Sequence, residues 1–138
     1  MLVRQVTTLS HTDAMKILHT IQAKLEQDGL SAAVAIVDAH GELIAFLRTD
    51  GCMLASIQIA INKAFTAARE RRETGVIGED ARQRGYPITN YGDLRYVGWD
   101  GGVPIHYQGA VVGGVGISGL YEAIEVELAK QGIAALEV

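Results

Sequence analysis

The sequence predicts an α+β domain in which helices cover both faces of a central antiparallel sheet. Pairs of short apolar runs are separated by tight glycine-containing turns, and strands joined in this way must run antiparallel. Segments with apolar residues at helical spacing precede, separate and follow these pairs, which is the order of an α-β-α sandwich. No linker or repeat divides the 138 residues, of which 49% are hydrophobic, so we expect one domain over residues 1–138.

The first helix has clear limits in the sequence. Ser10 is placed to cap its first turn, and Asp13 follows three residues later, as in a capping box. Gly29 is placed to end the helix. Between these limits the apolar residues recur at helical spacing, at Ala14, Ile17, Leu18, Ile21 and Leu25.

A buried hairpin and a strongly apolar helix come next. Residues 31–38 are a nearly continuous run of small and β-branched side chains, which is typical of a strand buried on both faces. A turn at 38–41 leads into a second strand at 43–47. Residues 53–71 then predict a helix that is apolar on more than one face. Such a helix lies either at the centre of a domain or against a second subunit, so we expect an oligomer.

The second half of the chain predicts a short helix, irregular chain and a second hairpin. The short helix is expected over 76–84, and residues 96–99 suit either a third strand or a loop. Pro104 opens the next strand, because proline lacks the N–H of an inner ladder. Gly109 supplies the positive φ of a tight turn, and the returning strand runs into glycines. A last helix begins near Tyr121.

Residues 114–119 match the GxGxxG pattern that binds dinucleotides in parallel βαβ units. Here the preceding strand is a hairpin partner and only one helix follows, which argues against dinucleotide binding. Two interpretations remain open. The free N–H groups at a helix start favour an anion near Ser118 and Gly119, or the glycines allow a helix to pack closely on the sheet.

Polar residues around the apolar helix indicate a pocket for an anionic ligand. Arg48 and Asp50 end the second strand, and Lys63 lies about three turns along the helix. Cations in a concave site attract an acid group. We predict that these residues meet three glycines in one cleft: Gly101, Gly102 and Gly119. The alternatives are a Lys63 side chain that extends along the surface to solvent, and a solvated strand end at Arg48 and Asp50.

Two histidines and the single cysteine are further candidates for chemistry. His19 lies on the first helix and His106 on an outer strand, where each either ligates a haem iron or another metal or is a structural or solvated histidine. No histidine pair has HxxxH or HExxH spacing, which argues against a structural zinc site. Cys52, at a helix start, has either a lowered pKa or no special reactivity. Because it is the only cysteine, it excludes a disulfide framework.

Composition excludes several classes of partner. The 12 basic and 16 acidic residues give a net charge of −4, and no basic block is longer than Arg71-Arg72, so nucleic acid is not an expected partner. No apolar run approaches 18 residues, and the first residues lack the pattern of a signal peptide. We therefore expect a soluble cytoplasmic protein without a membrane partner.

Eight short pieces of the sequence occur in order over most of the chain, at 35–43, 48–51, 55–57, 63–67, 101–105, 109–112, 116–119 and 132–136. Through them the chain resembles the GlcG/HbpS-like family, which includes the C-terminal domain of PduO-type proteins. The resemblance implies a profilin-like α-β-α sandwich with a five-stranded antiparallel sheet, in homo-oligomers of up to eight copies. It also implies haem or iron binding in some members, while others belong to glycolate or diol-utilisation gene clusters.

The chain departs from the family after the piece at 116–119. Family members often continue there with a run of Gly, Thr or Ser, Pro, Glu, Gln and Asp, whereas this chain has Leu120, Tyr121 and Glu122. The rim of the expected pocket is therefore more apolar and aromatic, which adds Tyr121 to the candidate ligand-binding residues.

Three functional hypotheses follow. The first is an oligomeric small-ligand-binding accessory protein with haem as the ligand, in which residues 120–121 contact the porphyrin and Lys63 or Arg48 meets a propionate. The alternative is a cofactor-independent enzyme acting on a small organic acid, with Lys63, Asp50 and Ser118 as its polar groups. The third is a structural unit of an assembly.

Overall fold

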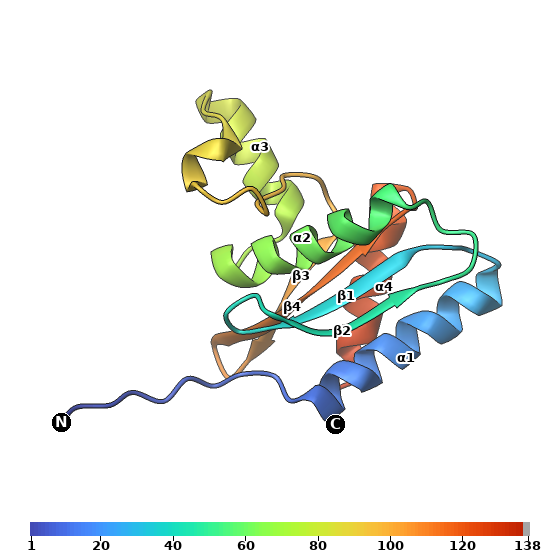
Figure 1. Ribbon diagram of the computed structural model, residues 1–138, viewed down its shortest axis with the longest axis horizontal. Helices are drawn as coiled ribbons and strands as arrows, with labels where there is room; N and C mark the ends of the chain where they lie inside the picture. The colour runs from blue at the N-terminus through green and yellow to red at the C-terminus, as the bar shows by residue number, and fades with distance from the viewer. Residues whose placement is uncertain (137–138) are drawn as a thin grey trace.

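The computed structural model describes residues 1–136. The last two positions of the domain expected over 1–138 lie outside the described residues. Figure 1 shows its elements. In chain order they are α1 (His11–Asp28), β1 (Ala33–Asp38), β2 (Leu43–Arg48), α2 (Ala55–Glu70), α3 (Thr74–Arg84), the 3-10 helix η1 (Ile88–Tyr91), β3 (Gly102–Tyr107), β4 (Ala110–Ser118) and α4 (Glu122–Ala134).

Helices cover both faces of the sheet, as the sequence predicts. Helix α2 packs on one face, and α1 and α4 pack on the other, which gives three layers (Figure 1). Successive residues of a strand point to opposite faces. In β1, Val34 and Ile36 join the core under α1 and α4, whereas Ala35 and Val37 face α2. The α+β class with an antiparallel sheet is confirmed.

Within residues 1–136 the sheet has four strands, so the five implied by the family resemblance are wrong for this chain. The strand order is β2-β1-β4-β3, and every neighbouring pair is antiparallel. Residues 96–99, which suited a strand or a loop, form a loop. The Val97 N–H donates to the Thr66 hydroxyl of α2 at 3.1 Å, so this backbone is held by a helix instead of the sheet edge.

Helix α1 forms as its sequence predicts. The Ser10 hydroxyl accepts a hydrogen bond from the Asp13 N–H at 3.1 Å, and Gly29 ends the helix with a φ of 65°. Its buried face consists of the five predicted apolar residues. These local signals fix where α1 begins and ends, and thereby which side packs on the sheet.

The glycines of β4 place α2 directly on the sheet. A Cβ on Gly114 would lie 2.6 Å from the Ala64 carbonyl oxygen of α2, and one on Gly116 would collide with the Ala60 carbonyl oxygen. A side chain at either position would push the helix away from the strand. The glycines do allow close packing of a helix on the sheet, and the antiparallel topology excludes dinucleotide binding in the parallel-sheet manner. An anion near Ser118 and Gly119 stays a prediction.

Candidate functional site

A buried ion pair lies where the ends of several elements meet. The Lys63 Nζ of α2 donates to Glu125 Oε1 of α4 at 2.9 Å and to the Ile117 carbonyl oxygen of β4 at 3.0 Å. The two side chains are 4% and 2% exposed. Glu125 Oε2 accepts a hydrogen bond from the Leu120 N–H at 3.0 Å. Each charge therefore has close polar partners inside the protein, which a buried ion pair requires.

Glycine makes room for this pair. A Cβ on Gly101 would lie 2.7 Å from both Lys63 Nζ and Glu125 Oε1, and one on Gly102 would lie 2.5 Å from the Lys63 carbonyl oxygen. Gly101 also has a φ of 120°, which side-chain-bearing residues rarely adopt. Glu125 sits in the first turn of α4, where the helix dipole favours a negative charge. The start of β3, the end of β4 and two helices thus converge on one packed cluster.

The predicted cleft is only partly found in this arrangement. Lys63 does meet Gly101 and Gly102, and Ser118 is buried beside Ile117, but the meeting point is packed and does not line the cavity described below. Two expectations for Lys63 are therefore corrected: its ammonium neither extends to solvent nor stands free for a ligand. The buried Glu125 carboxylate holds it inside the protein.

The other predicted ligand-binding residues lie at the surface around this cluster. Arg48 and Asp50 are exposed, as in the alternative of a solvated strand end. A Cβ on Gly119 would lie 3.4 Å from the Ser56 hydroxyl, so the end of β4 contacts the start of α2. Tyr121 is 84% exposed. Their roles in ligand binding stay predictions.

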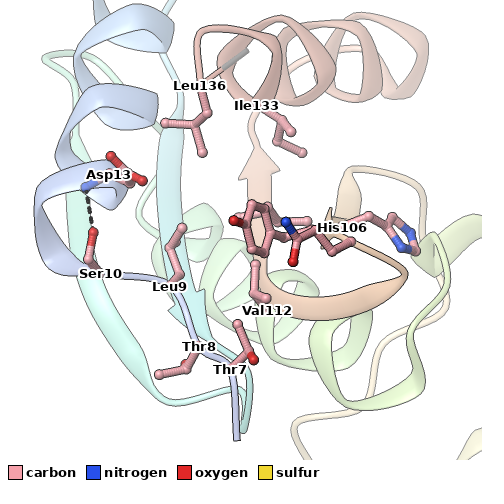
Figure 2. A pocket seen from close by; sticks show the side chains of 12 residues that line it. Thr7, Thr8, Leu9, Ser10, Asp13, His106, Val112, Ile133 and Leu136 are labelled. Carbon is pink, nitrogen blue, oxygen red and sulfur yellow. Dashed lines mark hydrogen bonds between the residues drawn. The ribbon is translucent and has the colours of Figure 1, made fainter. Parts of the chain in front are cut away.

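A cavity of about 580 Å³ lies at another place, between the segment before α1, the β3–β4 hairpin and the end of α4 (Figure 2). We call it the hairpin cavity. Its volume is in the range of small-ligand pockets. The sequence does not predict it, because its walls come from four separate segments. The lining residues are Thr7, Thr8, Leu9, Ser10, Asp13, Ile105, His106, Tyr107, Gln108, Val112, Ile133 and Leu136.

The hairpin cavity combines apolar walls with a polar rim. Leu9, Ile105 and Val112 are buried core residues that form part of its wall. Among the lining residues within 1–136, Asp13 is the only carboxylate and none is a lysine or arginine. Lys16 approaches Asp13 to 3.4 Å from the solvent side, where both side chains are well exposed. The cavity thus suits an occupant with apolar groups and a cation or hydrogen-bond donor.

The two candidate iron ligands are both accessible to solvent. His106 contributes to the cavity wall, but Figure 2 shows its imidazole pointing away from the other labelled side chains. His19 is exposed on α1. No group of three or more His, Cys, Asp or Glu side chains suited to a metal ion occurs in the described part of the chain. Any metal held here would need additional ligands from a cofactor or a second copy.

Cys52 is not an activated thiol. Partial burial raises its pKa above the ordinary value, and this outweighs the opposite effects of a hydrogen bond with Ser56 and the positive charge of Arg48. A raised pKa lowers the fraction of reactive thiolate at neutral pH. The interpretation without special reactivity is therefore the supported one.

An aromatic cluster, which the sequence analysis missed, joins α2 to the chain after α3. The Phe65 ring meets Tyr96 edge to face at 5.6 Å, and Tyr96 stacks on Tyr91 at 4.5 Å. A hydrogen bond with Tyr86 is the main reason that the pKa of Tyr91 rises to about 12, followed by burial and the negative charge of Glu70. The ring contacts pack Tyr91 of η1 and Tyr96 of the following loop against α2.

The family model for haem degrading protein HbpS-like matches residues 9–134. The chain belongs to the HbpS-like family. GlcG of Escherichia coli K12 is 33% identical over 117 residues, which cover 80% of this chain and 81% of GlcG. The resemblance stated from the sequence is thereby confirmed.

Solved structures of this family share the fold closely. A double mutant of HbpS from Streptomyces reticuli has a TM-score of 0.89 and 29% identity, covering 99% of this chain and 92% of that one. PduOC in complex with haem has a TM-score of 0.85 and 28% identity, covering 96% of this chain and 97% of that one.

No helix within residues 1–136 has the length and apolar character needed to cross a membrane.

Proposed function

We propose that this member of the HbpS-like family is an oligomeric accessory protein that binds haem. The observation that carries the proposal is the likeness to PduOC in its haem complex, which extends over nearly the whole of both chains. The family description, which names a haem-degrading protein, supports the same ligand.

The chain's residues favour a haem held at an accessible histidine over one enclosed in the hairpin cavity. Histidine is a common axial ligand of haem iron, and the side chains of His19 and His106 are exposed. The hairpin cavity offers apolar surface, but no lysine or arginine lines it to meet a propionate, and the His106 ring points away from it. Bound haem supplies the redox-active iron; the chain's part is to hold the porphyrin and ligate that iron.

Three surface residues are proposed as further haem contacts, one beside His19 on α1 and two at the end of the sheet away from His106. Met15 lies four residues before His19 on α1 and is 37% exposed, so it shares a helix face with the imidazole. Of the two predicted cations, Arg48 is at the surface and available to a propionate, whereas Lys63 is not. Tyr121, 84% exposed, is the proposed aromatic contact from the rim at the end of β4.

An oligomer is part of the proposal because α2 is not fully covered in a single chain. Ile57, Ile59 and Ile61 are only half-buried, and Met53 and Leu54, just before α2, are more than two-thirds exposed. Burying such side chains against a second copy is favourable. Light scattering at micromolar concentration tests this: a species of 14.8 kDa alone would contradict it.

The alternative, a cofactor-independent enzyme acting on a small organic acid, has less support. Lys63 was its central polar group, and the Lys63 ammonium is held by Glu125 and the Ile117 carbonyl. Asp50 is exposed, and Ser118 is buried and does not line the hairpin cavity. Ser10, Asp13 and His106 all line the hairpin cavity, but among the described residues no side-chain hydrogen bond joins the Ser10 hydroxyl to either possible base. That hydroxyl accepts from the Asp13 backbone N–H instead.

Haem titration of the purified protein tests the proposed function. We expect hemin to give a Soret band shifted from that of free hemin, with saturation at a fixed number of haems per chain. His19→Ala or His106→Ala should remove the shift, whereas His40→Ala, which changes an exposed histidine in the β1–β2 turn, should not. An unshifted wild-type spectrum would refute haem binding. A shift that survives the His19→Ala/His106→Ala double substitution would refute ligation by either histidine.

A further inference from the structure

The hairpin cavity has chemical requirements that the bound haem of the proposed function does not meet. Its inner wall is apolar, and Asp13, which Lys16 approaches to 3.4 Å, is the only carboxylate among the described residues that line it. Among the described residues, none of those lining it carries a positive charge other than a protonated histidine. A complementary occupant has apolar side chains on one face and a cation beside them.

The first eight residues of the chain have this composition and lack cover. This segment, residues 1–8, is called the arm. All of it is exposed, and three of its apolar side chains are largely in solvent: Leu2 at 101%, Val3 at 80% and Val6 at 57%. In Figure 1 the arm, drawn in dark blue, runs away from the rest of the molecule in an extended form. Exposed apolar residues gathered on one short segment mark an interaction site.

The arm and the cavity complement each other in the placement of their apolar residues and in charge. Alternate residues of an extended chain share a face, so Leu2, Arg4 and Val6 lie on one side. Arg4 is thus flanked by two apolar side chains, and no acidic residue precedes Asp13 in the chain. An arginine between two aliphatic groups matches an apolar wall with a carboxylate on its rim.

The arm cannot easily fill the cavity of its own chain, because its base already forms one wall. Thr7, Thr8 and Leu9 line the cavity, and two hydrogen bonds fix this base. The Leu9 N–H donates to the Val112 carbonyl oxygen at 2.9 Å, and the Thr8 hydroxyl accepts from the Ala39 N–H at 3.0 Å. From this fixed base the arm leads outward (Figure 1).

Two copies of the chain related by a two-fold axis near the cavity rim bring the arm of each copy to the cavity of the other. Two arms that leave adjacent rims run antiparallel, so each passes over the cavity of the other copy. We propose that the hairpin cavity receives the arm of a second copy of this chain, with the partner's Leu2 and Val6 against the apolar wall and the partner's Arg4 beside Asp13. The exchange is reciprocal and does not depend on haem.

Sedimentation velocity of the full chain without hemin, over a dilution series, tests the exchange. The Leu2→Asp/Val6→Asp double substitution should weaken association at least tenfold, because it puts two carboxylates against an apolar wall. These positions lie outside the core, so circular dichroism should show an unchanged fold. The matched control is Leu94→Asp, at a loop position that is 92% exposed, and it should associate as the wild type does. A wild type that is monomeric throughout, or an arm variant that associates as tightly as the wild type, would overturn the proposal.

Disulfide trapping identifies which surface the arm meets. In a Cys52→Ser background, a chain with Arg4→Cys is mixed with a mass-tagged chain with Asp13→Cys and oxidised. We expect a cross-linked heterodimer. Gln27→Cys, at the other end of α1 and about 21 Å from position 13, replaces Asp13→Cys as the control and should give no such product. Equal yields with both partners, or an internal disulfide in a single chain that carries both Arg4→Cys and Asp13→Cys, would overturn the proposal. Because no hemin is present, failure here leaves the haem titration as a separate question.

Discussion

Lys63 of α2 and Glu125 of α4 form a 2.9 Å ion pair across the end of the sheet, although their helices pack on opposite faces. Both side chains are almost completely buried. Within residues 1–136 no buried side-chain nitrogen or oxygen lacks a hydrogen-bond partner, so each polar atom of the pair has at least one. This pair joins α2 and α4 directly, although the two helices cover opposite faces of the sheet.

Removing one member of this pair should destabilise the protein strongly. Lys63→Met leaves the Glu125 carboxylate buried without its counter-ion, which costs about 3–5 kcal/mol. The Lys63→Met/Glu125→Leu double substitution should recover most of that loss, because it removes the unpaired charge. Urea unfolding monitored by circular dichroism measures both effects.

The surface pair of Lys130 and Glu73 provides the control for this prediction. Their side chains are 52% and 34% exposed, so Lys130→Met should change the free energy of unfolding by less than about 1 kcal/mol. If Lys63→Met cost no more than Lys130→Met, the buried pair would not be a connection that stabilises the fold.

Gly116→Ala should destabilise the packing of α2 on β4. The new methyl group would collide with the Ala60 backbone, and overpacking of this kind costs about 1–3 kcal/mol or more. The control is Gly85→Ala, where nothing lies within 4 Å of the new Cβ and only the positive φ of 72° opposes the substitution. A smaller loss at Gly116 than at Gly85 in thermal unfolding would show that the close approach is unimportant.

Tyr91 should titrate about two units above an ordinary tyrosine. Its pKa of about 12 in the folded protein lies above the value of 10.0 for an unperturbed tyrosine, mainly through the hydrogen bond with Tyr86. Because the folded state favours the protonated form, this contribution to stability is complete below pH 10 and disappears as the pH rises through 12. Ultraviolet or NMR titration should show the pKa falling toward 10 in Tyr86→Phe. An unchanged Tyr91 pKa in that variant would rule out the hydrogen bond as the main cause.

Features decided by neighbouring residues could be predicted from the sequence. The Ser10 cap, the Gly29 end and the apolar stripe of α1 act within a few residues, so each prediction was confirmed. The same holds for the hairpin turn at Gly109, with its φ of 80°. The order of these elements was enough to predict a sheet covered by helices on both faces.

Features that depend on distant partners could not be predicted in this way. Lys63 and Glu125 are 62 residues apart, and each is an unremarkable helix residue when considered alone. A lysine on an apolar helix suits a surface, a pocket or a buried pair, and only the fold decides among them. The hairpin cavity was missed for the same reason, since its wall residues are adjacent in space and not in the chain.

The strand order has a consequence for how the chain folds. The hairpins β1–β2 and β3–β4 each form between neighbouring segments, but the sheet becomes continuous only when Ala33 on β1 pairs opposite Ser118 on β4. Closing the long loop of chain between β1 and β4 costs conformational entropy, and the stabilising contacts between these central strands form only afterwards. The slow step of folding should therefore be the meeting of two preformed hairpins, with α2 packing across β1 and β4 on one face of the joined sheet. Until the hairpins meet, the open edge of β1 can pair with the β4 strand of another chain. Refolding at high protein concentration should therefore favour domain-swapped oligomers over the monomeric fold.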